Sequence, residues 1–267
     1  MGTKIDLVAD IGESFGQWRM SDDDPLLDII TSANVACGFH AGDPTTMDRT
    51  VRNCAARGIG VGAHPSFPDL VGFGRRAMDL SADEVRTDVL YQLGALHAFA
   101  VAHGAALTHI APHGRLGNLV ATRADYAAAV VDAVRSFDPD LIVLAQDGEL
   151  ADHARAHGIR VGIVAIVDRA YHPDSTLVPR SQPGAVIHDS KTLARRAVRM
   201  VTDGVVDAID GTLIRVAADT LLVHGDNTDA VQNATAIRAA LIDTGVQIAS
   251  LPEVLADRAA RSTTSCP

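Results

Sequence analysis

Residues 32–44 read SANVACGFHAGDP, an apolar run that is followed by His40 and Asp43. Five other apolar runs also lead into a histidine or a carboxylate. They are 5–9 before Asp10 and Glu13, 60–63 before His64, 107–110 before His113, 161–167 before Asp168-Arg169, and 221–223 before His224 and Asp226. In parallel α/β folds the carboxyl ends of the strands meet at one edge, where ligands bind. The repeated phase predicts one active site that is assembled from many loops.

Helical periodicity alternates with these runs along the whole chain. The helical segments are 45–57, 83–103, 125–137, 193–202 and 229–244, and further strands are expected at 141–144 and 247–249. About seven or eight strand–helix units in 267 residues favour an α/β fold with one closed barrel. We therefore predict a single-domain (β/α) barrel over residues 1–261 and a disordered tail at 262–267.

Composition excludes several classes of protein. The net charge of −10 argues against binding to nucleic acid or to an anionic membrane. The sequence contains no signal peptide and no apolar stretch of the roughly 18 residues that a membrane span needs. Three widely spaced cysteines suit a reduced, cytoplasmic protein and offer no disulfide framework.

Asp10, Glu13 and His40 are the first candidates for catalysis. Two nearby carboxylates can separate their pKa values and so act as acid and base, although Asp10 could instead cap its loop. His40 lies in a glycine-flanked turn, which favours a functional role. Asp43 precedes Pro44 and is predicted to be a helix N-cap. Cys37, within an apolar run, is expected to pack rather than react.

His64 and His113 also follow strands directly. Neutral imidazoles grouped with Asp10 and His40 could bind a divalent metal or act as general acid and base. No compact motif such as His-x-x-x-His occurs, so the sequence leaves the metal open.

Asp168, Arg169 and Arg180 are candidates for substrate binding, because a guanidinium can hold a carboxylate in bidentate fashion. An ion pair that pins the long loop 170–189 explains the same residues equally well. His224 could orient another side chain or cap the next helix. The sequence lacks a phosphate-binding loop, a dinucleotide-binding glycine motif and a serine-hydrolase elbow.

Together these stretches resemble the LamB/YcsF family, the A subunits of bacterial 5-oxoprolinase, over roughly residues 4–251. The matching segments are 10–13, 32–44, 62–69, 72–76, 112–114, 168–169, 177–184 and 224–226. The resemblance implies a barrel of the glycoside hydrolase/deacetylase type. It also implies ATP-dependent opening of 5-oxo-L-proline to L-glutamate, together with B and C partner subunits.

Under this interpretation, Asp10 or Glu13 acts as the base, and Arg169 or Arg180 holds the substrate carboxylate. The three histidines at positions 40, 64 and 113 position water or polarise the carbonyl. Hydrolysis of an unstrained five-membered lactam has little thermodynamic driving force, so coupling to ATP hydrolysis would provide it.

Four positions depart from the family pattern. Val8 replaces an asparagine, Ala111 a lysine, Gly117 a tyrosine, and Val164 falls about where a glutamate is common. These changes predict reduced or redirected catalysis. They leave two alternatives: a metal-dependent deacetylase or amidase that acts alone, and a degenerate paralogue that binds a ligand or partner without turnover.

Overall fold

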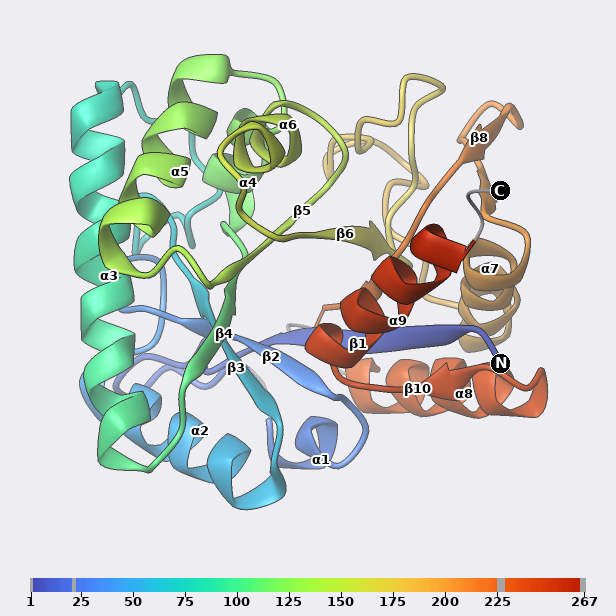
Figure 1. Cartoon of the computed structure of the whole chain (residues 1–267), viewed down its shortest axis with the longest axis horizontal. Coiled ribbons are helices and arrows are strands. Elements are labelled where there is room, and N and C mark those ends of the chain that lie inside the picture. Colours follow the sequence, from blue (N-terminus) through green and yellow to red (C-terminus); the bar gives the residue numbers. More distant parts are fainter. Residues whose placement is uncertain (1, 21–22, 225–228, 265–267) are drawn as a thin grey trace.

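Seven parallel strands close into a barrel in this computed structural model, which describes residues 2–20, 23–224 and 229–264 (Figure 1). In order around the ring they are β1 (Lys4–Ile11), β2 (Ser32–Ala36), β3 (Gly60–His64), β4 (Leu107–Ile110), β5 (Ile142–Ala145), β6 (Val161–Ile166) and β9 (Thr220–Val223). The ring closes because β9 pairs in parallel with both β6 and β1. Strand β10 (Gln247–Ile248) pairs with the start of β1 as an eighth member. The predicted barrel is confirmed.

Helices surround the strands (Figure 1). They are α1 (Asp24–Leu27), α2 (Pro44–Arg57), α3 (Ala82–Ala102), α4 (Gly114–Val120), α5 (Ala124–Phe137), α6 (Glu149–Ala156), α7 (Ser190–Thr202), α8 (Ala230–Asp243) and α9 (Leu251–Thr264). All five predicted helical segments are helical. The sequence did not predict α1, α4, α6, α9 or the antiparallel hairpin of β7 (Val205–Asp207) and β8 (Leu213–Arg215).

Two of the helix starts that matter for the site are capped by side chains. The Asp43 carboxylate accepts from the amides of Thr45 and Thr46 at the start of α2. Ser81 and Glu84 form the reciprocal capping box that starts α3.

At the other end of the chain, α9 continues to Thr264, into the stretch predicted as a tail, and residues 265–267 lie outside the described part.

Strand β1 shows how the barrel sorts its side chains. Ile5, Leu7 and Ala9 join the apolar clusters under the outer helices, whereas Asp6, Val8 and Asp10 alternate with them toward the interior. The strand therefore supplies one interior residue to each of three successive levels of the barrel.

The barrel interior has a polar part and an apolar part. Near the amino ends of the strands, Asp6 accepts from the hydroxyls of Ser32 and Thr220, at 2.7 and 2.6 Å. The apolar part is one cluster. Two leucines of α9 belong to this cluster, so α9 closes the barrel at the end where the strands begin. The buried members of the cluster are Val8, Ala111, Ile142, Leu144, Ile166, Leu222, Leu251 and Leu255.

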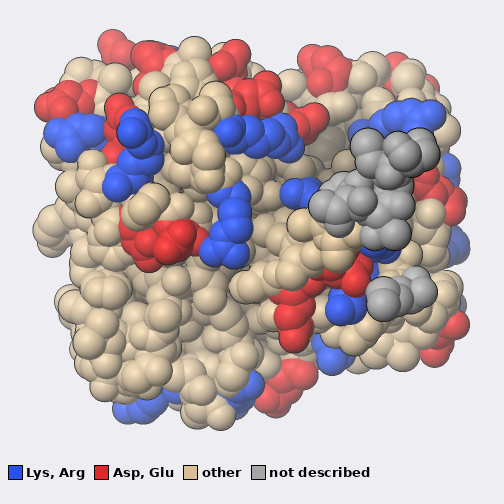
Figure 2. Space-filling view, viewed as in Figure 1, with Lys and Arg blue, Asp and Glu red and all other residues tan. Residues whose placement is uncertain are grey.

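Acidic and basic side chains are mixed on the face seen in Figure 2, with no broad patch of one sign. Within the described residues, none of the helices is both long and apolar enough to cross a membrane.

Candidate active site

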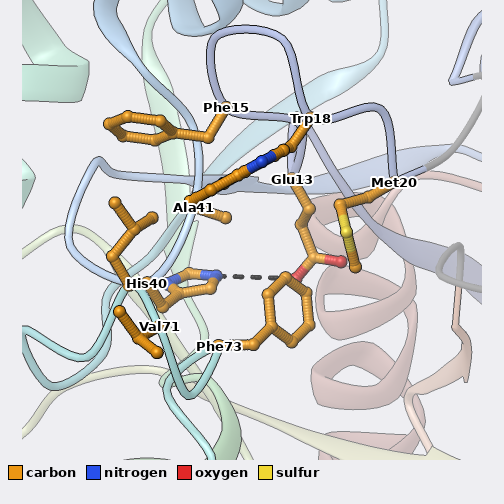
Figure 3. Close-up of a pocket in the computed structure, with 9 residues that line it drawn as sticks. Glu13, Phe15, Trp18, Met20, His40, Ala41, Val71 and Phe73 are labelled. Carbon is orange, nitrogen blue, oxygen red and sulfur yellow. Dashed lines mark ion pairs between the residues drawn. The ribbon is translucent and has the colours of Figure 1, made fainter.

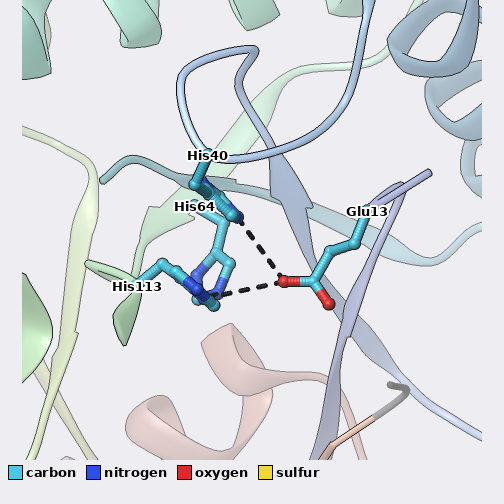
Figure 4. Close-up of side chains that lie close together, drawn as sticks. All are labelled: Glu13, His40, His64 and His113. Carbon is cyan, nitrogen blue, oxygen red and sulfur yellow. Dashed lines mark hydrogen bonds and ion pairs between the residues drawn. The ribbon is translucent and has the colours of Figure 1, made fainter. Parts of the chain in front are cut away.

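Four neighbouring strands deliver the predicted catalytic side chains to one point, and Figure 4 shows Glu13 and the three histidines among them. Asp10 and Glu13 come from the end of β1, His40 follows β2, His64 ends β3, and His113 follows β4. All five side chains are buried. The parallel order β1–β2–β3–β4 makes their carboxyl ends adjacent, so residues up to 103 positions apart in sequence meet at this edge.

Glu13 and the three histidines form the tightest group. One ligand atom from each lies within 4.8 Å of those of the others. Glu13 Oε1 is 3.5 Å from His40 Nε2 and 3.6 Å from His113 Nδ1. The rings of His40 and His113 are stacked with centroids 4.0 Å apart. Asp10 approaches from the barrel interior, with its Oδ1 3.4 Å from His64 Nε2.

Hydrogen bonds define which ring nitrogens of His64 and His113 face this group. His64 Nδ1 donates to the Ala111 carbonyl at 2.6 Å, and His113 Nε2 donates to the Phe73 carbonyl at 2.9 Å. A carbonyl oxygen only accepts, so His64 Nε2 and His113 Nδ1 remain, and they lie 2.9 Å apart. If both rings were neutral, the lone pairs of these two nitrogens would point at each other and repel. A proton or a metal cation between them would remove this repulsion.

Burial holds two of the imidazoles in the uncharged form. It lowers the pKa of His40 and of His113 well below the usual range, and neighbouring histidines lower both further. Burial alone would raise the pKa of Asp10, but the charge and hydrogen bond of His64 hold it well below the usual range. The site thus offers neutral imidazoles, which is the form that binds metals, beside an ionised carboxylate.

A second layer of polar side chains holds Asp10. Asn34 Nδ2 donates to Asp10 Oδ1 at 2.8 Å, and Asn34 Oδ1 accepts from His109 Nε2 at 2.9 Å. His109 is fully buried, and burial lowers its pKa to about 3. Neither Asn34 nor His109 was predicted from the sequence, because each lies within an apolar run. Their only signal was the inward phase of their strands.

Asp168 and His224 form a further pair at the ends of β6 and β9. His224 Nδ1 donates to both oxygens of Asp168, at 2.8 and 2.9 Å. Burial would lower the pKa of His224, but the charge and hydrogen bond of Asp168, helped by Asp10, raise it above the usual value. From the sequence, His224 was expected only to orient a side chain or cap a helix. Its phase after β9 was the signal for a role in the site. The neighbouring Asp226 lies outside the described residues.

Arg169 and Arg180, the predicted carboxylate binders, occupy different environments. Arg169 is buried, and its guanidinium donates to the carbonyls of Ala185 and Val178, at 3.2 and 2.5 Å. Burial, then the charge of Arg180, lower the pKa of Arg169 to about 10. Arg169 thus holds the loop after β6, whereas Arg180 is exposed on that loop.

Three of the four positions that were expected to depart from the family pattern lie at the apolar cluster inside the barrel. Val8 and Ala111 belong to the apolar interior cluster, and half-buried Val164 packs against it. Gly117 lies in α4, where a Cβ atom would stand 2.4 Å from the Pro112 carbonyl oxygen. A tyrosine at position 117 would therefore require this backbone to move.

A pocket of about 370 Å³ opens onto Glu13 and His40 (Figure 3). The other side chains around it are all apolar. They are Phe15, Trp18, Met20, Ala41, Leu70, Val71 and Phe73.

Comparisons with known proteins identify the family of this chain and agree with its fold. The profile of the LamB/YcsF family matches residues 5–256. The A subunit of 5-oxoprolinase from Mycobacterium avium (strain 104) is 51% identical over 245 residues, which cover 91% of this chain and 97% of that protein. The crystal structure of the lactam utilization protein from Thermus thermophilus has a TM-score of 0.88 and 46% identity, and covers 93% of this chain and 100% of that one. A structure described as T48 deacetylase with substrate shares only the fold, with a TM-score of 0.50 and 14% identity over 96% of this chain and 92% of that one.

Proposed function

Since this chain belongs to the LamB/YcsF family, we propose that it is the A subunit of a 5-oxoprolinase, which opens 5-oxo-L-proline or a related lactam to L-glutamate. One observation carries the proposal. Glu13, His40, His64 and His113 bring one ligand atom each to within 4.8 Å of one another at the carboxyl edge of the barrel. Ligand sites of such barrels lie at this edge.

The donor set fits a divalent metal ion. Three imidazoles and one carboxylate suit zinc and similar ions. Two of the imidazoles already donate their other nitrogen to a backbone carbonyl, as metal-bound histidines commonly do. We propose that Glu13, His40, His64 and His113 hold such an ion, with Asp10 beside them. The ion would supply a Lewis acid for an amide group.

The remaining polar residues supply the proton chemistry. Breaking the carbon–nitrogen bond of a lactam requires a proton on the departing nitrogen. His224 suits this step, because Asp168 raises its pKa and stabilises the protonated ring. Asp10, which is ionised and held by Asn34, would stabilise positive charge on His224. Arg180 is the stronger candidate for the substrate carboxylate, because it is exposed on the loop after β6 whereas Arg169 is buried.

ATP and partner subunits complete the proposed reaction. The relative from Mycobacterium avium is named as one lettered subunit of its enzyme, which implies an assembly of several subunits. We propose that B and C subunits contribute the handling of ATP, since this chain has no phosphate-binding loop motif. Phosphorylation of the amide oxygen would create a better leaving group.

Two alternatives have an observation in their favour. The metal-type donor set would equally serve a deacetylase or amidase that acts alone. The apolar residues at positions 8, 111 and 164 would suit a paralogue that binds a ligand or partner without turnover.

Glutamate release from 5-oxoproline distinguishes these functions. The purified chain should release glutamate only when ATP and the B and C subunits are present. Turnover of 5-oxoproline by the chain alone, without ATP, would instead support the independent amidase. No turnover of 5-oxoproline under any of these conditions would reject the proposal.

A further inference from the structure

The apolar pocket described above extends the site away from the barrel axis. Its floor is formed by Glu13 and His40, and seven of its nine lining residues are apolar. His40 is fully buried, and neither of its ring nitrogens has a hydrogen-bond partner among the described residues. At about 370 Å³ the pocket falls within the size range of small-molecule sites.

One wall of the pocket is a rigid turn. Phe15 and Trp18 exchange two backbone hydrogen bonds, at 3.0 and 2.9 Å, and their ring centroids lie 6.4 Å apart. The amide of Gly16, whose φ is +55°, donates to the Asp43 carboxylate at 2.9 Å. Because Asp43 also caps α2, this turn is tied to the barrel. The backbone that carries the two aromatic rings is therefore tied to the barrel.

The opposite wall is equally fixed. It carries Leu70, Val71 and Phe73 on a turn that folds around the carboxylate of Asp69. This carboxylate accepts from the amide of Gly72 at 2.9 Å and from the side chain and amide of Arg76. The guanidinium of Arg76, by its hydrogen bond, lowers the pKa of Asp69, so the carboxylate stays ionised.

Apolar side chains at the mouth of the pocket are exposed to water. Trp18 is 61%, Met20 43% and Val71 85% exposed. An apolar group that entered between them would remove this surface from water, and aromatic rings are the common anchors of such sites. 5-Oxoproline, a small and polar lactam, would leave this surface uncovered.

We propose that this pocket binds an aromatic substituent of the substrate, so that the preferred substrate is a lactam that carries an aromatic group. The inference rests on the proposed function, because the amide of that substrate would lie at Glu13 and His40.

Trp18 is the only tryptophan of the chain, so its fluorescence reports directly on this pocket. We would titrate the protein with 2-pyrrolidinone and with 5-benzyl-2-pyrrolidinone, which differ by the aromatic group alone. The benzyl compound should change the Trp18 emission and bind at least about tenfold more tightly. Val71→Asp should abolish this preference. The matched control is Val101→Asp, which makes the same substitution at an exposed valine on α3, outside the pocket. It should leave the preference unchanged.

Equal affinity for the two lactams, or a preference that survives Val71→Asp, would overturn the inference. A change of Trp18 emission with ATP alone, competitive with the benzyl compound, would also overturn it and assign the pocket to the adenine base. The readout is binding, so it is independent of turnover. A benzyl preference without any lactam hydrolysis would support the pocket and reject the proposed function. Turnover of 5-oxoproline without a benzyl preference would do the reverse.

Discussion

Two backbone carbonyls determine how His64 and His113 can act. By accepting a hydrogen bond from one N–H of each ring, the Ala111 and Phe73 carbonyls leave the other nitrogen of each histidine for the cluster. The Phe73 carbonyl is placed there by a left-handed backbone, with φ of +53° at a residue other than glycine. Such a conformation is uncommon outside functional turns, and here it lies between two glycines, Gly72 and Gly74.

A comparison of His113→Ala with Cys37→Ala tests which residue carries the chemistry. Loss of His113 should reduce turnover by roughly 10²-fold or more, because a side chain of the cluster is removed. Burial raises the pKa of the Cys37 thiol to about 12, so it stays protonated at neutral pH and its loss should hardly change the rate. Turnover of both variants is measured at matched stability. An equal loss of rate in the cysteine variant would point to thiol chemistry.

Asp168→Asn tests the role of His224 through its pH dependence. Asp168 raises the pKa of His224, and burial alone would lower it. A proton donor works below its pKa, so the alkaline limb of the kcat/KM profile should move to lower pH in the variant. At alkaline pH the loss should be roughly tenfold for each unit by which the pKa falls. Asp83→Asn, on the exposed first turn of α3, is the control. An unmoved limb would exclude His224 as the donor.

At the scale of elements, two of the positions where the resemblance leads us to expect another residue are Val8, within β1, and Ala111, directly after β4. Val8 pairs with Ser32 and Leu222 on the neighbouring strands and is fully buried. The double variant Val8→Asn with Ala111→Lys should raise 5-oxoproline turnover with partner subunits, by up to about 10²-fold, because it restores polar donors at the site. It should also cost about 1–3 kcal/mol of stability, since it places polar groups among apolar ones.

Val8→Leu with Ala111→Met is the matched control, because it adds similar volume without polar groups. Glutamate release and thermal unfolding are measured for both double variants. If the polar variant folds and remains as slow as the parent, these positions do not limit the reaction. If the parent is already fast, they were never catalytic in this chain.

The sequence predicted where the barrel strands end, because each apolar run is followed by a polar residue that faces ligand or water. The hairpin of β7 and β8 was missed, since strands of three residues carry too little pattern. His109 was missed for a different reason. Its ring fits only because residue 62 is glycine, where a Cβ atom would lie 2.0 Å from His109 Nε2. Such complementarity between two strands is not readable from either strand alone.

The candidate site was likewise predicted in part from the sequence. The phase of the runs predicted that Asp10, Glu13, His40, His64 and His113 converge, and they meet in the structure. The pairing of Asp168 with His224, 56 residues later, depends on β9 closing the ring against β6, which the sequence did not specify. Likewise, the buried position of Arg169 depends on how the loop after β6 folds back.

At the scale of the whole molecule, Asp6 should make the free energy of unfolding depend on pH. Its carboxyl is fully buried where β1 meets β2 and β9, and burial raises its pKa to about 6 despite hydrogen bonds from Thr220, Ser32 and Thr31. An acid whose folded pKa is raised binds more protons when folded. Its contribution to stability is therefore greatest at low pH and is lost as the pH rises through about 6.

Asp6→Asn should remove this dependence. Relative to the variant, the parent should lose about 1.4 kcal/mol of unfolding free energy between roughly pH 5 and pH 7.5, since pH 5 lies about one unit below the folded pKa. Urea unfolding of both proteins at each pH gives the difference. The buried histidines affect both proteins alike and cancel. A difference that does not vary with pH would show that Asp6 titrates normally.

One centre, made of Glu13, His40, His64 and His113, is the core of the proposed chemistry. The most direct test is to titrate zinc into the chelator-treated chain while following both bound metal and, with ATP and the partner subunits, glutamate release. We predict one bound ion per chain and activity that is restored in proportion to it, with both lost together in Glu13→Gln. Full activity of the metal-free enzyme, or a bound ion that survives in Glu13→Gln with activity unchanged, would contradict this assignment.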